Sequence, residues 1–233
     1  MILMQLKIME SKGDEKIWVK LESSVGFANA LRRVIISGLP SFAVDEVSIY
    51  ENNSSLYNEY VANRIGLIPL TYEEGEADDA RVSLTLNAEG PKIVYSSDLT
   101  SSDERIKPVN EKFPIADLGE NQKLRLDAYA VKGTARKHAK FQCAIASYNY
   151  FPKLKKDAKV CLNHAIEIGS PNAKTFATSE CDACKLDDKG ELEYKDDEFT
   201  FFVESYNNIS AREHLKTALK IMKEQAKEIK KQV

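Results

Sequence analysis

The stretch SSVGFANALRRVIISG, residues 23–38, decides the predicted fold. Apolar residues in it recur at the spacing of one helical face, and they are Phe27, Leu31, Val34 and Ile35. Ser24 can cap the start of this helix, and Gly38, directly before a Leu-Pro pair, can end it. We therefore expect a capped amphipathic helix near the amino terminus.

Strand patterns lie on both sides of this helix. Apolar and polar residues alternate in five segments, 4–8, 17–21, 47–49, 82–86 and 124–128, and a sixth strand is predicted at 199–204. Segment 56–70 is expected to begin as a short helix and to leave it extended, because the residue before Pro69 avoids the helical region. The sequence therefore predicts an α+β fold with a mostly β middle.

A second amphipathic helix is predicted at the carboxyl terminus. Ser210 and Glu213 have the spacing of a capping box. One apolar stripe follows at steps of four and three residues, and it consists of Leu215, Leu219, Met222, Ala226 and Ile229. Burying five such side chains contributes about 10 kcal/mol before the entropy of ordering. We therefore expect the stripe to pack either within the chain or against a partner helix across a dimer interface.

Composition limits the class of protein. The 233 residues are 43% hydrophobic and 30% charged, enough for a real core, and the net charge is -3, from 33 Lys and Arg against 36 Asp and Glu. A self-sufficient nucleic-acid binder is typically basic, so we expect contact with DNA to be indirect. The sequence has no apolar run of the length that crosses a bilayer and no signal-peptide pattern. We expect a cytoplasmic protein without a membrane partner.

Five blocks of the sequence resemble, in the same order, blocks of the alpha-like subunits of DNA-directed RNA polymerase. They are FANALRRV with the following GLP (27–40), AVDEV (43–47), EYVANRIGLIPL (59–70), GTARKHAKFQ (133–142) and FFVES (201–205). Together they span nearly the whole chain. The resemblance is strongest to the archaeal members of this family, which also includes bacterial alpha and the third eukaryotic subunit.

The resemblance implies a three-part organisation. A dimerisation domain would consist of residues 1–46 plus 196–233, and an inserted β-rich domain of residues 47–152. Residues 153–195 would form a small cysteine-containing insert, either ferredoxin-like or degenerate ferredoxin-like.

The resemblance also implies a non-catalytic role in polymerase assembly. The chain would pair with the small alpha-like subunit (L) and then recruit the small zinc-binding subunit (N) and the two large catalytic subunits. The sequence itself has no Asp-rich magnesium loop, no phosphate-binding glycine loop and no histidine in a nucleophile or base signature, so no catalytic residue is predicted.

Two sets of surface residues follow from the resemblance. The implied dimer interface consists of Phe27, Leu31, Val34, Ile35, Leu215, Leu219 and Met222. The implied docking sites for the large subunits are Arg32 and Arg33 on the first helix and Arg136, Lys137, His138 and Lys140 in the loop 133–142. Arginine suits interface carboxylates because its planar fork binds them bidentately. The arginines of the helix could instead be its solvated face, and the loop could be a solvated basic loop. For the loop, direct phosphate binding is a third alternative.

The cysteines suggest a metal site but leave its nature open. Cys181 and Cys184 are three residues apart, a spacing that can present two thiolates to one metal, and Cys161 lies twenty residues before Cys181. Some members of the family carry an iron-sulfur cluster near these positions. Three thiolates could hold a 3Fe-4S cluster, or a 4Fe-4S cluster with Asp187 or water as the last ligand.

A zinc ion held by the same three cysteines and His164 is less favoured than an iron-sulfur cluster. A disulfide, or an insert without any metal, is a further alternative. An iron-sulfur redox or redox-sensing protein is the alternative function. Cys143 shares a strand face with Phe141 and Ile145, so we expect a buried apolar residue there.

Overall fold

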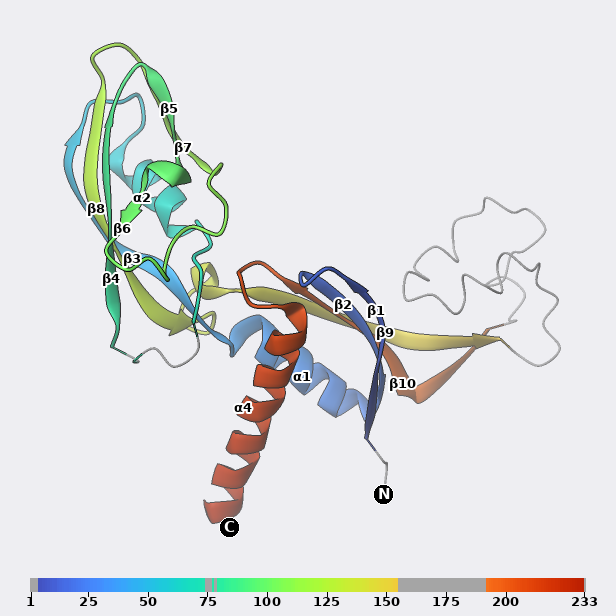
Figure 1. Ribbon diagram of the computed structural model, residues 1–233. Helices are drawn as coiled ribbons and strands as arrows, with labels where there is room; N and C mark the ends of the chain where they lie inside the picture. The colour runs from blue at the N-terminus through green and yellow to red at the C-terminus, as the bar shows by residue number, and fades with distance from the viewer. Residues whose placement is uncertain (1–3, 74–76, 78, 155–191, 233) are drawn as a thin grey trace, which may run out of the picture.

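The computed structural model describes residues 4–73, 77, 79–154 and 192–232, and its α+β architecture is shown in Figure 1. Two units, each built on an antiparallel sheet, contain these residues. The elements are β1 (Gln5–Lys12), β2 (Lys16–Glu22), α1 (Val25–Ser37), β3 (Pro40–Asn52), α2 (Asn58–Gly66), β4 (Arg81–Glu89), β5 (Lys92–Tyr95), η1 (Ser96–Asp98), β6 (Thr100–Ser101), β7 (Pro114–Leu118), β8 (Lys123–Thr134), η2 (Ala139–Phe141), β9 (Ala144–Leu154), β10 (Leu192–Ser205) and α4 (Ala211–Gln232).

Sheet A joins the two ends of the chain in the strand order β1-β2-β10-β9. Phe201 of β10 lies opposite Val19 on one side and Tyr148 on the other, so strands far apart in sequence form one surface. The apolar residues of β2 alternate onto one face, and there Val19 and Leu21 are buried beneath α1 and the first turns of α4. We call these elements the terminal unit. The expected pairing of the two chain ends is confirmed.

Sheet B forms the inserted unit, with the strand order β3-β8-β4-β6 and a separate pair β5-β7. Helix α2 and the β5-β7 pair cover one face of it, as Figure 1 shows. Alternate residues of β4 and β8, such as Leu84 and Leu126, are fully buried in this second core. The β-rich middle predicted from the sequence is confirmed.

The chain passes between the two units at two adjacent points. Pro40, at the start of β3, lies opposite Thr134, at the end of β8. Ser41 Oγ donates a hydrogen bond of 2.5 Å to the carbonyl oxygen of Phe141. A Cβ on Gly133 would lie 2.7 Å from the Phe141 ring, so this junction requires glycine. Both crossings are therefore tightly packed.

The boundaries of the two units differ from the predicted ones at each junction. Strand β3 begins at Pro40, so residues 40–46, predicted in the dimerisation domain, lie in sheet B. Strand β10 begins at Leu192, so residues 192–195, predicted in the insert, lie in sheet A. Strand β9 pairs with β10 along Ala144–Leu154, so residues 144–152 belong to the sheet of the chain ends rather than to the inserted domain. The sequence analysis expected a strand around Cys143, but neither its continuation to Leu154 nor its pairing with β10, because strand pairing depends on residues far apart in the sequence. The helix predicted within 56–70 is α2, which is followed at Leu70 by a single bridge to Pro108. No helix among the described residues is long and apolar enough to cross a membrane.

Candidate subunit interface

Helix α1 is positioned by its cap and by one fully apolar face. Ser24 Oγ accepts a hydrogen bond from the Phe27 amide at 3.3 Å, as the sequence predicts for a capping serine. The face toward sheet A is buried, and it consists of Ala28, Leu31, Val34 and Ile35. These residues share one core with α4 and the sheet.

Helix α4 begins on the same core. Ser210 Oγ accepts from the Glu213 amide at 3.2 Å, which confirms the predicted cap. His214, in the first turn, is 4% exposed, and its Nε2 lies 2.9 Å from Asn207 Oδ1 and 3.2 Å from Ser205 Oγ. Burial lowers the pKa of His214 to about 4, so the ring is neutral at physiological pH.

The second half of α4 leaves the body of the molecule, as Figure 1 shows. Leu215 is buried, Leu219 and Met222 are half-buried, and Ala226 is exposed. Ile229, the last residue of the stripe, is 62% exposed. The two halves of the stripe therefore differ in burial. The first two turns pack within the chain, whereas no described residue covers the last two.

The predicted interface residues divide in the same way. Leu31, Val34, Ile35 and Leu215 lie in the core of the terminal unit, where a partner does not contact them directly. Phe27, Leu219 and Met222 lie at the edge of that core and retain surface. The sequence pattern identified the apolar faces that both helices turn toward the core, but it did not separate residues that face the chain's own sheet from residues that remain accessible.

An apolar shelf beside α1 was not predicted. Leu6 and Ile8 of β1 lie opposite Leu21 and Val19, so they point to the helix-bearing face of sheet A. Their exposed fractions are 40% and 37%, and Met4 directly before them is also exposed. Alternation in 4–8 did indicate an apolar face, but not that this face extends beyond the cover of α1.

The two arginines of α1 differ in their contacts. Arg32 Nη2 and Nε donate to Asn29 Oδ1 at 2.9 and 3.3 Å, which holds the half-buried side chain along the helix. Arg33 is exposed.

The basic loop 133–142 is held against β3 by one carboxylate. Asp45 accepts from Lys140 Nζ at 2.6 Å and from Lys137 Nζ at 3.0 Å. Hydrogen bonds from Lys140 and Lys137 hold the pKa of Asp45 below its usual value. Both ammonium groups also lie over the Phe141 ring, 5.4 and 5.6 Å from its centroid. Arg136, Lys137 and His138 are all exposed, so the loop presents these three side chains to solvent.

A shallow pocket of about 200 Å³ lies between this loop, β3 and the end of α2. Its wall includes His138, Lys140, Asp45 and the apolar Leu67, which is exposed. Tyr60 of α2 is also exposed. The loop therefore adjoins an apolar surface, a feature that composition alone did not indicate.

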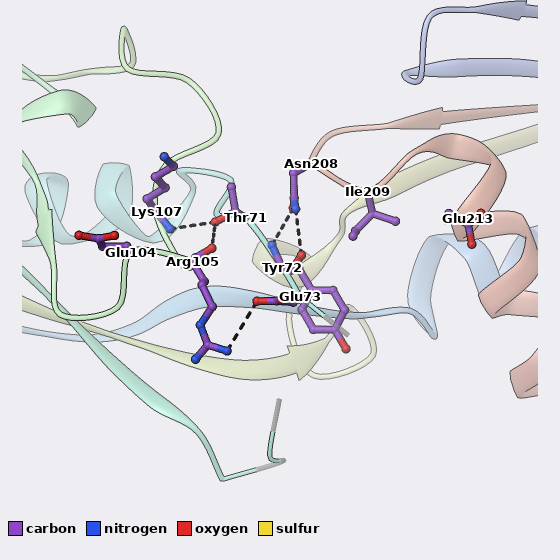
Figure 2. A pocket seen from close by; sticks show the side chains of 9 residues that line it. All are labelled: Thr71, Tyr72, Glu73, Glu104, Arg105, Lys107, Asn208, Ile209 and Glu213. Carbon is purple, nitrogen blue, oxygen red and sulfur yellow. Dashed lines mark hydrogen bonds and ion pairs between the residues drawn. The ribbon is translucent and has the colours of Figure 1, made fainter. Parts of the chain in front are cut away.

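A larger groove, of about 570 Å³, opens where the two units meet (Figure 2). Its floor contains Tyr72 and Ile209. Arg105 Nη1 lies 3.6 Å from Glu73 Oε2, and the same guanidinium binds Asp103 at 2.7 Å. The remaining lining residues are Thr71, Glu104, Lys107, Asn208 and Glu213. Charges of both signs lie side by side in this groove, so they favour no single class of small ligand.

The predicted cysteine site falls on residues that the structure does not describe. Cys161, Cys181 and Cys184, with the alternative ligands Asp187 and His164, lie between 155 and 191. Across the described parts of the chain, no group of three or more His, Cys, Asp or Glu side chains could hold a metal ion. The prediction that Cys143 is buried is confirmed, and burial raises the pKa of its thiol to about 12. The strand face predicted for Phe141, Cys143 and Ile145 is wrong, because Phe141 lies in η2 and β9 begins only at Ala144.

Comparisons with known proteins give the family context for this geometry. The family described as the RNA polymerase Rpb3/RpoA insert domain matches residues 43–149. DNA-directed RNA polymerase subunit Rpo3 of Pyrococcus furiosus is 36% identical over 245 aligned positions, which cover 95% of this chain and 94% of that protein. Rpo3 of Pyrobaculum arsenaticum is 39% identical over 216 positions, covering 84% and 83%. Rpo3 of Thermococcus kodakarensis is 44% identical over 159 positions, covering 65% and 61%.

Proposed function

Because the chain belongs to the alpha-like Rpb3/RpoA family as an archaeal Rpo3 subunit of DNA-directed RNA polymerase, we propose that it is the scaffold on which that polymerase assembles. Members of this family are non-catalytic subunits of the enzyme. The scaffold pairs first with the small alpha-like subunit (L). It then binds the small zinc-binding subunit (N) and the two large catalytic subunits, while DNA is contacted only by the assembled enzyme in the cytoplasm.

One observation carries the pairing step: the uncovered distal half of α4. A helix of 22 residues is about 33 Å long at 1.5 Å per residue, and only its first half packs on sheet A. The distal half has no packing against the residues that the structure describes, yet it keeps apolar residues in register with the buried ones. Helical stability in proteins comes chiefly from packing of an apolar face, so a partner surface is the natural cover.

The proposed interface therefore has an inner and an outer layer. The outer layer contacts the small alpha-like subunit, and it consists of Phe27, Leu219, Met222, Ala226, Ile229 and the β1 shelf residues Leu6 and Ile8. The inner layer fixes the two helices on sheet A, and it consists of Leu31, Val34, Ile35 and Leu215. A partner of the same fold would meet this face with equivalent helices related by a pseudo-two-fold axis.

The large subunits are proposed to dock on the basic surface. Arg136 and His138 are exposed on either side of Lys137, which together with Lys140 forms ion pairs with Asp45 of β3. Arg33 of α1 adds a second exposed guanidinium, and its neighbour Arg32 is half-buried and bonded to Asn29. Carboxylates on a large subunit are the matching chemistry, since arginine binds them bidentately.

Co-expression with the small alpha-like subunit tests the pairing step. A stable 1:1 complex on size-exclusion chromatography with light scattering is expected, and addition of the large subunits to it should give a larger complex. The account of pairing fails if the two chains elute separately at micromolar concentration. The proposed docking surface is refuted if the pair forms but the double variant Arg136→Glu, Arg33→Glu recruits the large subunits as well as the wild-type chain does.

The cysteine-containing insert stays a prediction. A cluster or zinc ion held by Cys161, Cys181 and Cys184 would add to the scaffold rather than replace it.

A further inference from the structure

The two units meet along a line that could act as a hinge. The chain crosses from α1 into β3 and returns from β8, and the two crossings are paired strands, with Pro40 opposite Thr134. The Arg136 amide donates to the carbonyl oxygen of Ser37 at 3.1 Å, beside the same line. Adjacent crossings resist separation of the units, but they resist rotation about the line much less.

A third connection lies beside the crossings, on the side of α4. The Tyr72 amide donates to Asn208 Oδ1 at 2.7 Å, and Asn208 Nδ2 donates to the Tyr72 carbonyl oxygen at 3.0 Å (Figure 2). One side-chain amide thus pairs with both polar groups of one backbone residue, as a neighbouring strand would. The two residues are 136 positions apart in the sequence and belong to different units.

Asn208 is carried by a loop that is fixed to the terminal unit. The Tyr206 amide donates to the carbonyl oxygen of Cys143, and the Ala211 amide donates to that of Asp14, both at 2.8 Å. Within the loop, Ser205 Oγ donates to the Ile209 carbonyl oxygen at 2.6 Å. These bonds hold the backbone on either side of Asn208, so its amide is presented from a rigid support.

Tyr72 is fixed equally firmly to the inserted unit. Its neighbour Thr71 donates through its amide to the Lys107 carbonyl oxygen at 2.8 Å. The Tyr72 ring is 7% exposed, and its centroid lies 6.1 Å from that of Phe42 in the core of sheet B. Ile209, next to Asn208, packs against this same core. An apolar contact between the units therefore accompanies the two hydrogen bonds.

We propose that Asn208 is a clasp that fixes the angle between the terminal unit and the inserted unit. With the clasp closed, rotation about the paired crossings would break two hydrogen bonds and withdraw Ile209 from the second core. The groove of Figure 2 is lined by residues of both units, so its width is set by the same clasp. The consequence for assembly rests on the proposed function: a partner that touches both units requires one defined angle.

The angle can be measured on the full chain with Asn208→Ala. Spin labels on non-natural amino acids at exposed positions 120 and 224, one in each unit, report the distribution of distances between the units. Amide exchange by NMR reports the bond itself. We expect a broader distance distribution and exchange at Tyr72 about tenfold faster, the factor that about 1.4 kcal/mol represents, with no change at Thr71. Asn87→Ala, an exposed asparagine on β4, is the matched control.

Asn208→Asp is the second variant, since it keeps an acceptor for the Tyr72 amide but loses the donor to the Tyr72 carbonyl oxygen. Here we expect the Tyr72 amide to stay protected while the distance distribution broadens. Because Asn208 is exposed, neither substitution leaves a cavity. The clasp is refuted if both variants keep the wild-type distance distribution, whatever the exchange at Tyr72.

A subunit-recruitment experiment distinguishes failure of this inference from failure of the proposed function. Asn208→Ala should still form the complex with the small alpha-like subunit but recruit the large subunits at least tenfold more weakly. Failure of the wild-type chain to form either complex would refute the proposed function. The proposal that Asn208 fixes the angle would then be tested by the spin-label distances alone. Wild-type recruitment by a variant with a broadened angle would refute the link between clasp and assembly.

Discussion

Replacing Ile229 by Asp should separate partner binding from folding. Ile229 is 62% exposed in the isolated chain, so an aspartate there is hydrated and should change the free energy of unfolding by less than about 0.5 kcal/mol. In the proposed heterodimer the same position is covered. Loss of the buried isoleucine removes about 2 kcal/mol, and burial of an unpaired carboxylate adds at least about 1 kcal/mol more. The dissociation constant should therefore rise by a factor of about 100 or more.

The assay is a titration of the small alpha-like subunit into the full chain, followed by calorimetry, with a thermal melt of the chain alone. Lys227→Asp is the control, because it changes the charge by more but lies on the opposite face of α4. Unchanged affinity for Ile229→Asp would refute the proposal that the distal stripe is an interface. Equal weakening by both variants would show that charge, rather than apolar contact, governs the association.

Three further results are expected. Leu215→Asp places a carboxylate in the core of the terminal unit, so it should lower the stability of the isolated chain by more than about 4 kcal/mol in chemical denaturation; a normal unfolding midpoint would contradict the core assignment. His214 is protonated in the unfolded chain below about pH 6.5 but in the folded chain only below about pH 4, so stability should fall by about 3 kcal/mol as the pH drops through this window, and His214→Gln should lack this part of the profile. Arg136→Glu should leave the melting temperature and the heterodimer unchanged while weakening recruitment of the large subunits about tenfold or more, and wild-type recruitment would remove Arg136 from the docking surface.

Local signals predicted the elements well where caps and periodicity agreed. Ser24 and Ser210 cap α1 and α4 as expected, because each cap depends only on residues three positions away. The alternation in β2 and β4 likewise gave both the strands and their buried faces. These features are encoded within short segments, so they can be recognised without knowledge of the tertiary structure.

The accessible part of the interface could not be predicted in the same way. A period of 3.6 marks Leu31 and Ile229 equally as apolar-face residues, yet one is fully buried and the other is exposed. The difference arises because sheet A ends before α4 does, and sheet width depends on long-range pairing of β2 with β10. The clasp was missed for a similar reason, since nothing near Asn208 in the sequence indicates a partner 136 positions away.

The central claim is most directly tested by anaerobic purification of the native assembly through a tag on this chain, with mass spectrometry of every co-purifying protein and assays for iron and zinc. We expect the small alpha-like subunit, the small zinc-binding subunit and both large polymerase subunits in equal amounts, with the metal content reporting separately on the cysteine-containing insert. Recovery of the chain alone, or with redox partners and stoichiometric iron, would contradict the scaffold role.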